Sequence, residues 1–276
     1  MPNYYAHLTF GHRVLEQLPA ALAGILKKEE EAFRLGCLGP DPLLFYRVRR
    51  ATPVRREGKE MHRSSALPVV ERLRRAVEAG VPLSRGYSAG FLCHLALDSA
   101  CHGYIDCRAD RGAATHMAME GEFDRMLMAA DGRNFMERHY LPQVTDPAVW
   151  TAASSACERV SPPELEEAYQ AMTRYTRMLV RSYGRLLGRL VEGIAHLPGC
   201  GSFRGMALRK KVALNCVESN RELLRRLEGA VDEAAEQIAG FFAAVEEGRP
   251  VSRWFDRDFK GNPPARQSEP KESVLC

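Results

Sequence analysis

The sequence lacks the usual features of exported, membrane-spanning and nucleotide-binding proteins. It contains no run of about 18 apolar residues, the length that a membrane-spanning helix needs. Its first residues lack the apolar core of a signal peptide. No βαβ pattern, glycine-rich phosphate loop or internal repeat is found along the chain. We therefore expect a soluble, cytoplasmic protein with no transmembrane segment.

Regular cysteine spacing and a strong net charge are also absent. The eight cysteines form no CxxC pair, and several lie in apolar helical patterns, where a free thiol packs as a small hydrophobe. This usage favours a reducing compartment. The net charge of +4 is too small to indicate nucleic-acid binding by itself. With 45% hydrophobic residues, the 276-residue chain can form a sizeable core.

Five potential metal ligands lie close together in the sequence, between residues 94 and 120. His94, Asp98 and His102 follow one another at intervals of four residues, and His116 and Glu120 repeat that interval after a polar break. Residues four apart lie on one face of a helix. Because the first stripe has apolar neighbours, we expect it to be buried. An unpartnered buried imidazole or carboxylate is costly, so the pattern favours a metal that satisfies all five groups.

Three earlier residues complete the candidate set: His7, Asp41 and His62. Asp41 lies between two prolines on what we expect to be a stiff loop, although an ordinary turn aspartate would fit the same pattern. Mixed imidazole and carboxylate donors suit zinc best, with iron and manganese as alternatives. The eight ligands are too many for one tetrahedral zinc, so we expect two or three ions.

Closely spaced zinc ions point to hydrolysis of a phosphate ester. Such ions activate water near neutral pH and neutralise the charge that develops on phosphate and leaving group. Hydrolysis of a carboxylic ester or amide is chemically possible as well. A basic loop that includes Arg55 and Arg56 is a candidate phosphate-binding segment, with a solvated loop as the alternative.

Helical spacing of apolar residues along most of the chain predicts an all-α, multi-helix bundle. We expect residues 1–160 to form the metal-binding core. Residues 161–261 should form a long antiparallel helical pair that packs on this core within the same domain. The polar, proline-containing residues 262–276 are predicted to be disordered.

Four segments of the chain resemble the bacterial zinc-dependent phospholipase C family: AHLTFG, LGCLGPDPLLFY, GFLCHLALDSACHGYI and THMAMEGEFD. That family is all-helical and related to the trinuclear zinc nucleases that cleave single-stranded nucleic acid. The resemblance covers about residues 1–130. It implies a zinc-dependent phospholipase C-like bundle that hydrolyses phospholipid or another phosphodiester by attack of a metal-activated water.

The resemblance also implies a role for each ligand. The first zinc would be held by Asp41, His62, His94 and Asp98, the second by His102, His116 and Glu120, and the third by His7, Asp98 and the N-terminal amine. Asp41 would be a catalytic base, and Asp98 would bridge two ions. If Met1 is removed, as expected before proline, the amine of Pro2 would become the ligand of the third zinc.

Two alternatives from other classes stay open. A single-strand nuclease-like metallohydrolase should have aromatic side chains in a basic groove, but only Phe45 and Tyr46 accompany the basic loop. A non-catalytic, zinc-stabilised helical domain should have closed sites rich in cysteine, whereas this ligand set is rich in carboxylates. Both arguments favour the phosphodiesterase.

Overall fold

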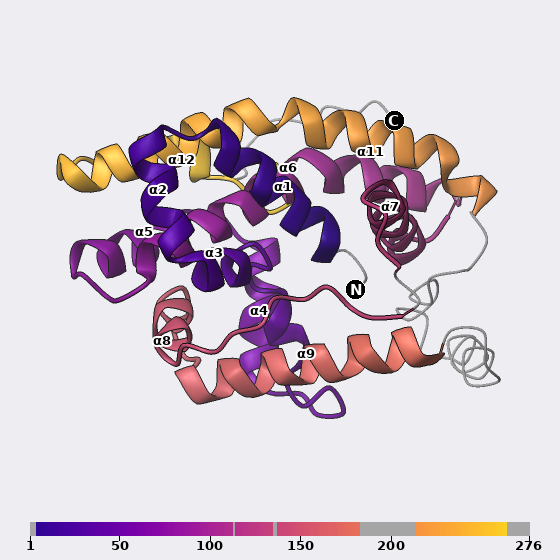
Figure 1. Ribbon diagram of the computed structural model, residues 1–276, viewed down its shortest axis with the longest axis horizontal. Helices are drawn as coiled ribbons and strands as arrows, with labels where there is room; N and C mark the ends of the chain where they lie inside the picture. Colours follow the sequence, from indigo (N-terminus) through magenta and orange to yellow (C-terminus); the bar gives the residue numbers. More distant parts are fainter. Residues whose placement is uncertain (1–3, 113, 135–136, 183–212, 264–276) are drawn as a thin grey trace, which may run out of the picture.

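The computed structural model describes residues 4–112, 114–134, 137–182 and 213–263. These residues form helices and connecting segments without any strand, so the predicted all-α fold is confirmed (Figure 1). The α-helices are α1 (Tyr4–Gln17), α2 (Ala20–Lys28), α3 (Glu30–Gly36), α4 (Pro53–Arg63), α5 (Leu67–Glu78), α6 (Ser84–Asp110), α7 (His116–Ala130), α8 (Ala148–Ser154), α9 (Pro162–Ser182), α11 (Val217–Gly229) and α12 (Val231–Glu246). Short 3-10 helices are η1 (Asp41–Phe45), η3 (Leu214–Cys216) and η4 (Arg253–Phe255).

Helix α6 is the centre of the fold and packs against α1, α3, α5, α7, α8, α11 and α12. The stretch Phe91–Leu97 is buried without interruption, as expected of a helix that is covered on all sides. His94 and Asp98 lie in this buried part of α6. Their polar side chains therefore face other protein elements rather than bulk water.

Glycines bring α3 very close to α6 and so set the position of the segment that follows α3. A Cβ added to Gly90 would lie 2.0 Å from the carbonyl oxygen of Phe33, which leaves no room for a side chain. The chain then turns through Gly39, whose φ of +52° favours glycine. A Cβ at Gly39 would lie 2.4 Å from Cδ2 of His94. This close turn delivers Asp41, the first residue of η1, to the neighbourhood of His94.

The first turn of α1 is fixed to α7 by a buried carboxylate. Asp124 accepts hydrogen bonds from the backbone N–H groups of Tyr5 (3.0 Å) and Ala6 (2.8 Å). These donors belong to the start of a helix, where N–H groups have no partner within the helix. The anchor holds His7, one residue further along, against α6.

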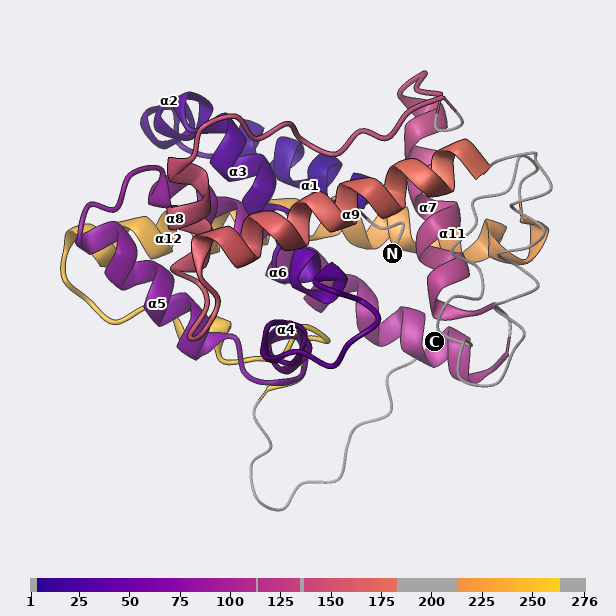
Figure 2. The ribbon, with the colours of Figure 1, turned by 90° about the horizontal axis from the view of Figure 1, so that it is seen from below.

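The C-terminal helices cover opposite sides of the core instead of pairing with each other. In Figure 1, α9 runs along the lower side of the molecule while α11 and α12 run along the upper side; Figure 2, seen from below, shows α9 in front of them. Helix α9 packs on η1 and α8, whereas α11 and α12 pack on α6. The predicted antiparallel pair is therefore not found among the described residues. Helix α9 covers η1 and α8 rather than α6, so the two sets of helices bury different surfaces of the core.

Parts of the predicted organisation fall outside the described residues, namely positions 183–212 of the expected helical pair and positions 264–276 of the expected tail. The domain boundaries stay a prediction. Within the described part of the chain, no helix combines the length and apolar character needed to cross a bilayer.

The cysteines differ in part from expectation. Cys37, Cys93, Cys101, Cys157 and Cys216 are free thiols, but Cys107 is disulfide-bonded. The cytoplasmic location stays a prediction.

Candidate metal centre

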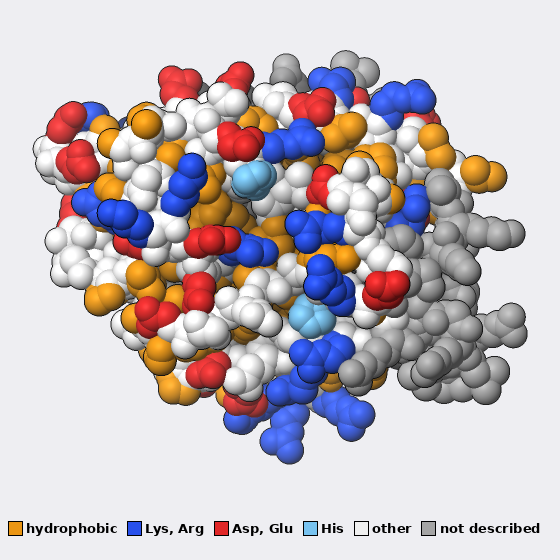
Figure 3. Space-filling model, viewed as in Figure 1, with side chains coloured by type: hydrophobic (Ala, Val, Ile, Leu, Met, Phe, Trp, Pro, Cys, Tyr) orange, Lys and Arg blue, Asp and Glu red, His pale blue; other side chains and the backbone are white. Residues whose placement is uncertain are grey.

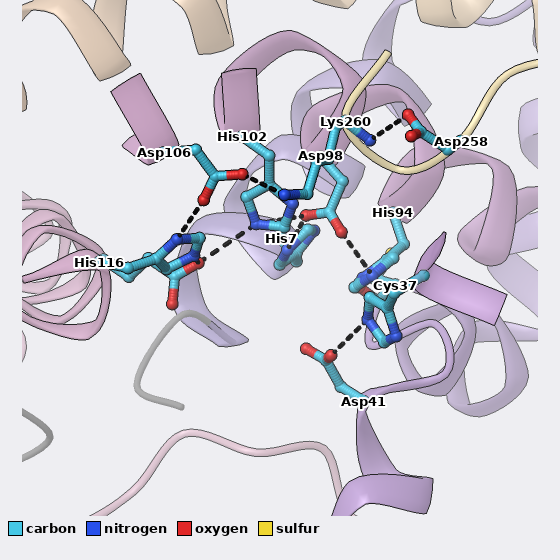
Figure 4. Close-up of polar contacts among 12 residues, drawn as sticks. His7, Cys37, Asp41, His94, Asp98, His102, Asp106, His116, Asp258 and Lys260 are labelled. Carbon is cyan, nitrogen blue, oxygen red and sulfur yellow. Dashed lines mark hydrogen bonds and ion pairs between the residues drawn. The ribbon is translucent and has the colours of Figure 1, made fainter. Parts of the chain in front are cut away.

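The structure brings all eight predicted ligands together from five elements of the fold. They form three groups, in each of which the potential ligand atoms lie within 4.8 Å of one another. The groups are His7–His94–Asp98, Asp41–His62–His94 and His102–His116–Glu120. The first two groups share His94 and are therefore contiguous. Figure 4 shows their side chains converging from both sides of α6.

Asp98 connects the groups. Its Oδ1 lies 3.2 Å from Nε2 of His7 and 3.6 Å from Nε2 of His102, and its Oδ2 lies 3.3 Å from Nε2 of His94. The residue is only 2% exposed. Burial alone would raise the pKa of Asp98, but His102, His94 and His7 together hold it well below its usual range. Asp98 is thus a buried anion that can bridge neighbouring cations.

Two buried ring nitrogens of this cluster lack a hydrogen-bond partner: Nδ1 of His7 and Nε2 of His94. The latter lies at ion-pair distance from Asp98 but is not aligned for a hydrogen bond. The two rings stack with centroids 4.0 Å apart. A cation on Nε2 of His94 would remove the cost of burying that nitrogen unpaired. Burial is the main cause that lowers the pKa of His7, and the nearby His94 lowers it further. Both effects favour the neutral ring, which is the form that binds a metal. The residues present therefore fit zinc.

Hydrogen bonds to backbone carbonyl oxygens orient the histidine rings on the side of η1. Nδ1 of His94 lies 3.2 Å from the carbonyl oxygen of Cys37, and Nδ1 of His62 lies 2.6 Å from that of Gly58. These contacts aim both Nε2 atoms at the centre, as outer partners of metal-binding histidines do. Nε2 of His62 lies 3.1 Å from Oδ1 of Asp41. Burial opposes the charged ring, but Asp41 outweighs it and raises the pKa of His62.

The third group joins α6 to α7. Oε1 of Glu120 lies 3.2 Å from Nε2 of His102 and 2.9 Å from Nε2 of His116. Burial opposes charge on both rings. The carboxylates nevertheless raise the pKa of His102 to about 9 and that of His116 to about 10. Although burial would raise the pKa of Glu120, the two imidazoles hold it far below its ordinary value.

Asp106 is a site residue that the sequence analysis missed. Its Oδ1 lies 2.8 Å from Nδ1 of His116, the nitrogen opposite the one that faces Glu120. This hydrogen bond with His116 lowers the pKa of Asp106 to about 2. The carboxylate–histidine pair fixes which ring nitrogen is left to bind a metal. The signal was present in the sequence, because Asp106 follows His102 by the same interval of four residues.

The two arginines predicted to bind phosphate lie on α4 but differ in their surroundings. Arg55 donates hydrogen bonds to the carbonyl oxygens of Leu44 (3.2 Å), Val48 (2.9 Å) and Arg50 (3.0 Å), which gives it a structural role in the preceding loop. Arg56 is exposed and borders a small surface hollow. Phosphate binding by either residue stays a prediction. Pro2 lies outside the described residues.

Comparison with known families agrees with this geometry. The chain matches the family described as zinc dependent phospholipase C over residues 6–171, which is more than half of its length and includes all eight ligand candidates. The chain belongs to the zinc-dependent phospholipase C family. The resemblance seen in the sequence is thereby confirmed. No curated protein and no solved structure matches the chain.

For this member of the zinc-dependent phospholipase C family, we predict that zinc binding releases protons. His102 and His116 have raised pKa values of about 9 and about 10 in the metal-free protein, so both rings are charged at pH 7.5. Zinc binds only neutral imidazole, so loading the third group should release about two protons. Calorimetric titration in buffers with different ionisation enthalpies measures this number. Equal heats in all buffers would contradict the prediction.

The same two rings determine a pH dependence of the metal-free fold. Because folding raises their pKa values, their stabilisation is complete below about pH 6.5, the ordinary histidine pKa. It should disappear as the pH rises through about 9 and about 10. Zinc should therefore stabilise the protein more as the pH rises over this range.

Proposed function

We propose that this protein is a zinc-dependent phosphodiester hydrolase of the phospholipase C type that holds two or three zinc ions. The observation that carries the proposal is the convergence of eight nitrogen and oxygen donors in three groups linked by His94 and Asp98. Family membership supports the choice of zinc. The mixed donor set, with carboxylates and without cysteine, is typical of catalytic rather than structural zinc.

The chain's own residues have distinct roles in this proposal. Asp98 lies between imidazoles of two groups and would hold their cations close together. Asp41 is 8% exposed and hydrogen-bonded to His62, so it is held in one orientation at the edge of the cluster. We assign it the role of the base that accepts a proton from the attacking water. Bound zinc would supply positive charge for the phosphate and lower the pKa of water.

Exposed arginines support an anionic substrate. They come from segments that are distant in sequence: Arg49, Arg50, Arg138, Arg174 and Arg177. Arg174 and Arg177 belong to α9, which packs on η1. Arg47, in the loop after η1, forms an ion pair of 2.9 Å with Glu167 of α9. Figure 3 shows Lys and Arg side chains gathered over the lower part of this face. We propose phospholipid, or another phosphodiester, as the substrate.

The decisive experiment compares substrates with and without a chelator. We expect hydrolysis of bis-p-nitrophenyl phosphate that chelation abolishes and zinc restores. Vesicles of phosphatidylcholine and of anionic phospholipid should release diacylglycerol. Faster cleavage of single-stranded DNA than of any lipid would instead support the nuclease. Retained zinc without turnover of any of these substrates would support a structural zinc domain and overturn the proposal.

A further inference from the structure

The segment after α12, residues 251–262, passes over the metal centre, and we call it the C-terminal strap. The strap lies beyond residues 6–171, the part of the chain that matches the family. Its aromatic residues Phe255 and Phe259 are completely buried. Two hydrogen bonds join the strap to the connection between α4 and α5. Ser65 Oγ donates to Asp256 Oδ1 at 2.7 Å, and the backbone N–H of Ala66 donates to the carbonyl oxygen of Arg257 at 2.8 Å.

Phe259 packs directly on two of the candidate ligands. Its ring centroid lies 5.1 Å from that of His62 and 5.7 Å from that of His94. His62 has the more exposed side chain, at 20%, whereas that of His94 is 1% exposed. The hydrogen bonds of the two rings set the direction of each nitrogen, and Phe259 limits rotation of the ring planes. Loss of this contact would remove packing that keeps the His62 ring beside Asp41.

The residue after Phe259 reaches a different ligand group. Lys260 forms an ion pair with Asp106, whose other oxygen lies 2.8 Å from Nδ1 of His116 (Figure 4). Lys260 lies in a turn that Asp258 closes. The Asp258 side chain accepts hydrogen bonds from the backbone N–H groups of Lys260 and Asn262, both at 2.9 Å. The turn lies against the backbone of α6, because a Cβ added to Gly261 would lie 2.7 Å from the carbonyl oxygen of Ser99.

We propose that Phe259 and Lys260 are positioning residues for two separate metal sites. Phe259 acts on the Asp41–His62–His94 group, and Lys260 acts through Asp106 on the His102–His116–Glu120 group. Two adjacent residues of the strap thus hold ligands that come from η1, α4, α6 and α7. This inference rests on the zinc binding of the proposed function but not on the identity of the substrate.

The test is a zinc titration that reports on each group separately. Histidine ring nitrogens are followed by ¹H–¹⁵N NMR while free zinc is set with a competing chelator. Phe259→Leu should raise the zinc concentration needed at His62 and His94 by about tenfold, as loss of an outer partner does. It should leave the curves of His102 and His116 unchanged.

Lys260→Met should produce the opposite pattern. An exposed ion pair contributes up to about 1 kcal/mol, so the zinc requirement of His102 and His116 should rise by up to about fivefold. The curves of His62 and His94 should not move. Asp106→Asn should give a larger effect on the same two rings, about 10–100-fold.

Matched controls separate positioning from general loss of stability. Phe242→Leu removes the same volume from another buried phenylalanine, in α12, and Lys28→Met removes an exposed lysine of α2. Neither control should change any zinc curve. The inference is overturned if Phe259→Leu and Phe242→Leu have equal effects, or if Lys260→Met leaves His102 and His116 unaffected. A wild-type protein that binds no zinc would instead refute the proposed function.

Discussion

Replacing Asp98 with asparagine should remove at least one zinc ion per chain and lower phosphodiesterase turnover by about 10³-fold. The substitution keeps the size of the side chain but removes the charge that three imidazoles surround. A bridging anion offsets the repulsion between neighbouring cations, and asparagine cannot replace it. Loss of one catalytic ion costs several kcal/mol of transition-state stabilisation, which corresponds to a rate factor of about this size.

The control for Asp98→Asn lies on the same helix. Asp110 is an exposed residue at the end of α6, and Asp110→Asn should leave both zinc content and turnover unchanged. Zinc is counted by atomic emission after gel filtration, and circular dichroism verifies that the variant is folded. Turnover within threefold of the wild type, with full zinc content, would show that Asp98 does not bridge the ions.

The second large effect concerns stability. Asp124→Ala should lower the free energy of unfolding by about 3 kcal/mol, because two buried N–H groups at the start of α1 lose their acceptor. Since His7 is the next residue after these donors, the loosened turn should also weaken zinc binding at the His7–His94–Asp98 group. Urea denaturation of the metal-free protein measures the first effect, and zinc titration measures the second.

Asp131→Ala provides the comparison for Asp124→Ala. Asp131 follows α7 and accepts one hydrogen bond, from the hydroxyl of Tyr5 at 2.6 Å, but it is exposed. Because water can replace this partner, the variant should lose no more than about 1 kcal/mol. An equal loss in the two variants would mean that the Asp124 carboxylate does not anchor α1.

The sequence was informative where the chemistry follows the period of a helix. The four-residue spacing from His94 to His102 and from His116 to Glu120 correctly predicted that these side chains are neighbours on two helices. That they bind metal stays a prediction. Each series continues by one more carboxylate, Asp106 in α6 and Asp124 in α7. Neither was predicted, because α6 continues to Asp110 through part of the polar break before His116, and Asp124 accepts hydrogen bonds from the backbone of α1 instead of joining a metal group.

What the sequence could not supply was the packing of distant segments. Nothing in the local pattern shows that Phe259 and Lys260 lie beside ligands more than 140 residues earlier in the chain. The separation of α9 from α11 and α12 has a similar cause. The apolar face of each helix indicates burial but does not identify the partner: α9 packs on η1 and α8, whereas α11 and α12 pack on α6.

The most direct test of the account is anomalous diffraction at the zinc absorption edge from crystals of the zinc-loaded protein. We predict two or three peaks, each about 2.0–2.2 Å from imidazole nitrogens and carboxylate oxygens of the three groups. One peak should lie between Asp98 and His94. A single peak at cysteine, or none near Asp98 in zinc-saturated crystals, would contradict the central claim that these eight side chains form one zinc centre.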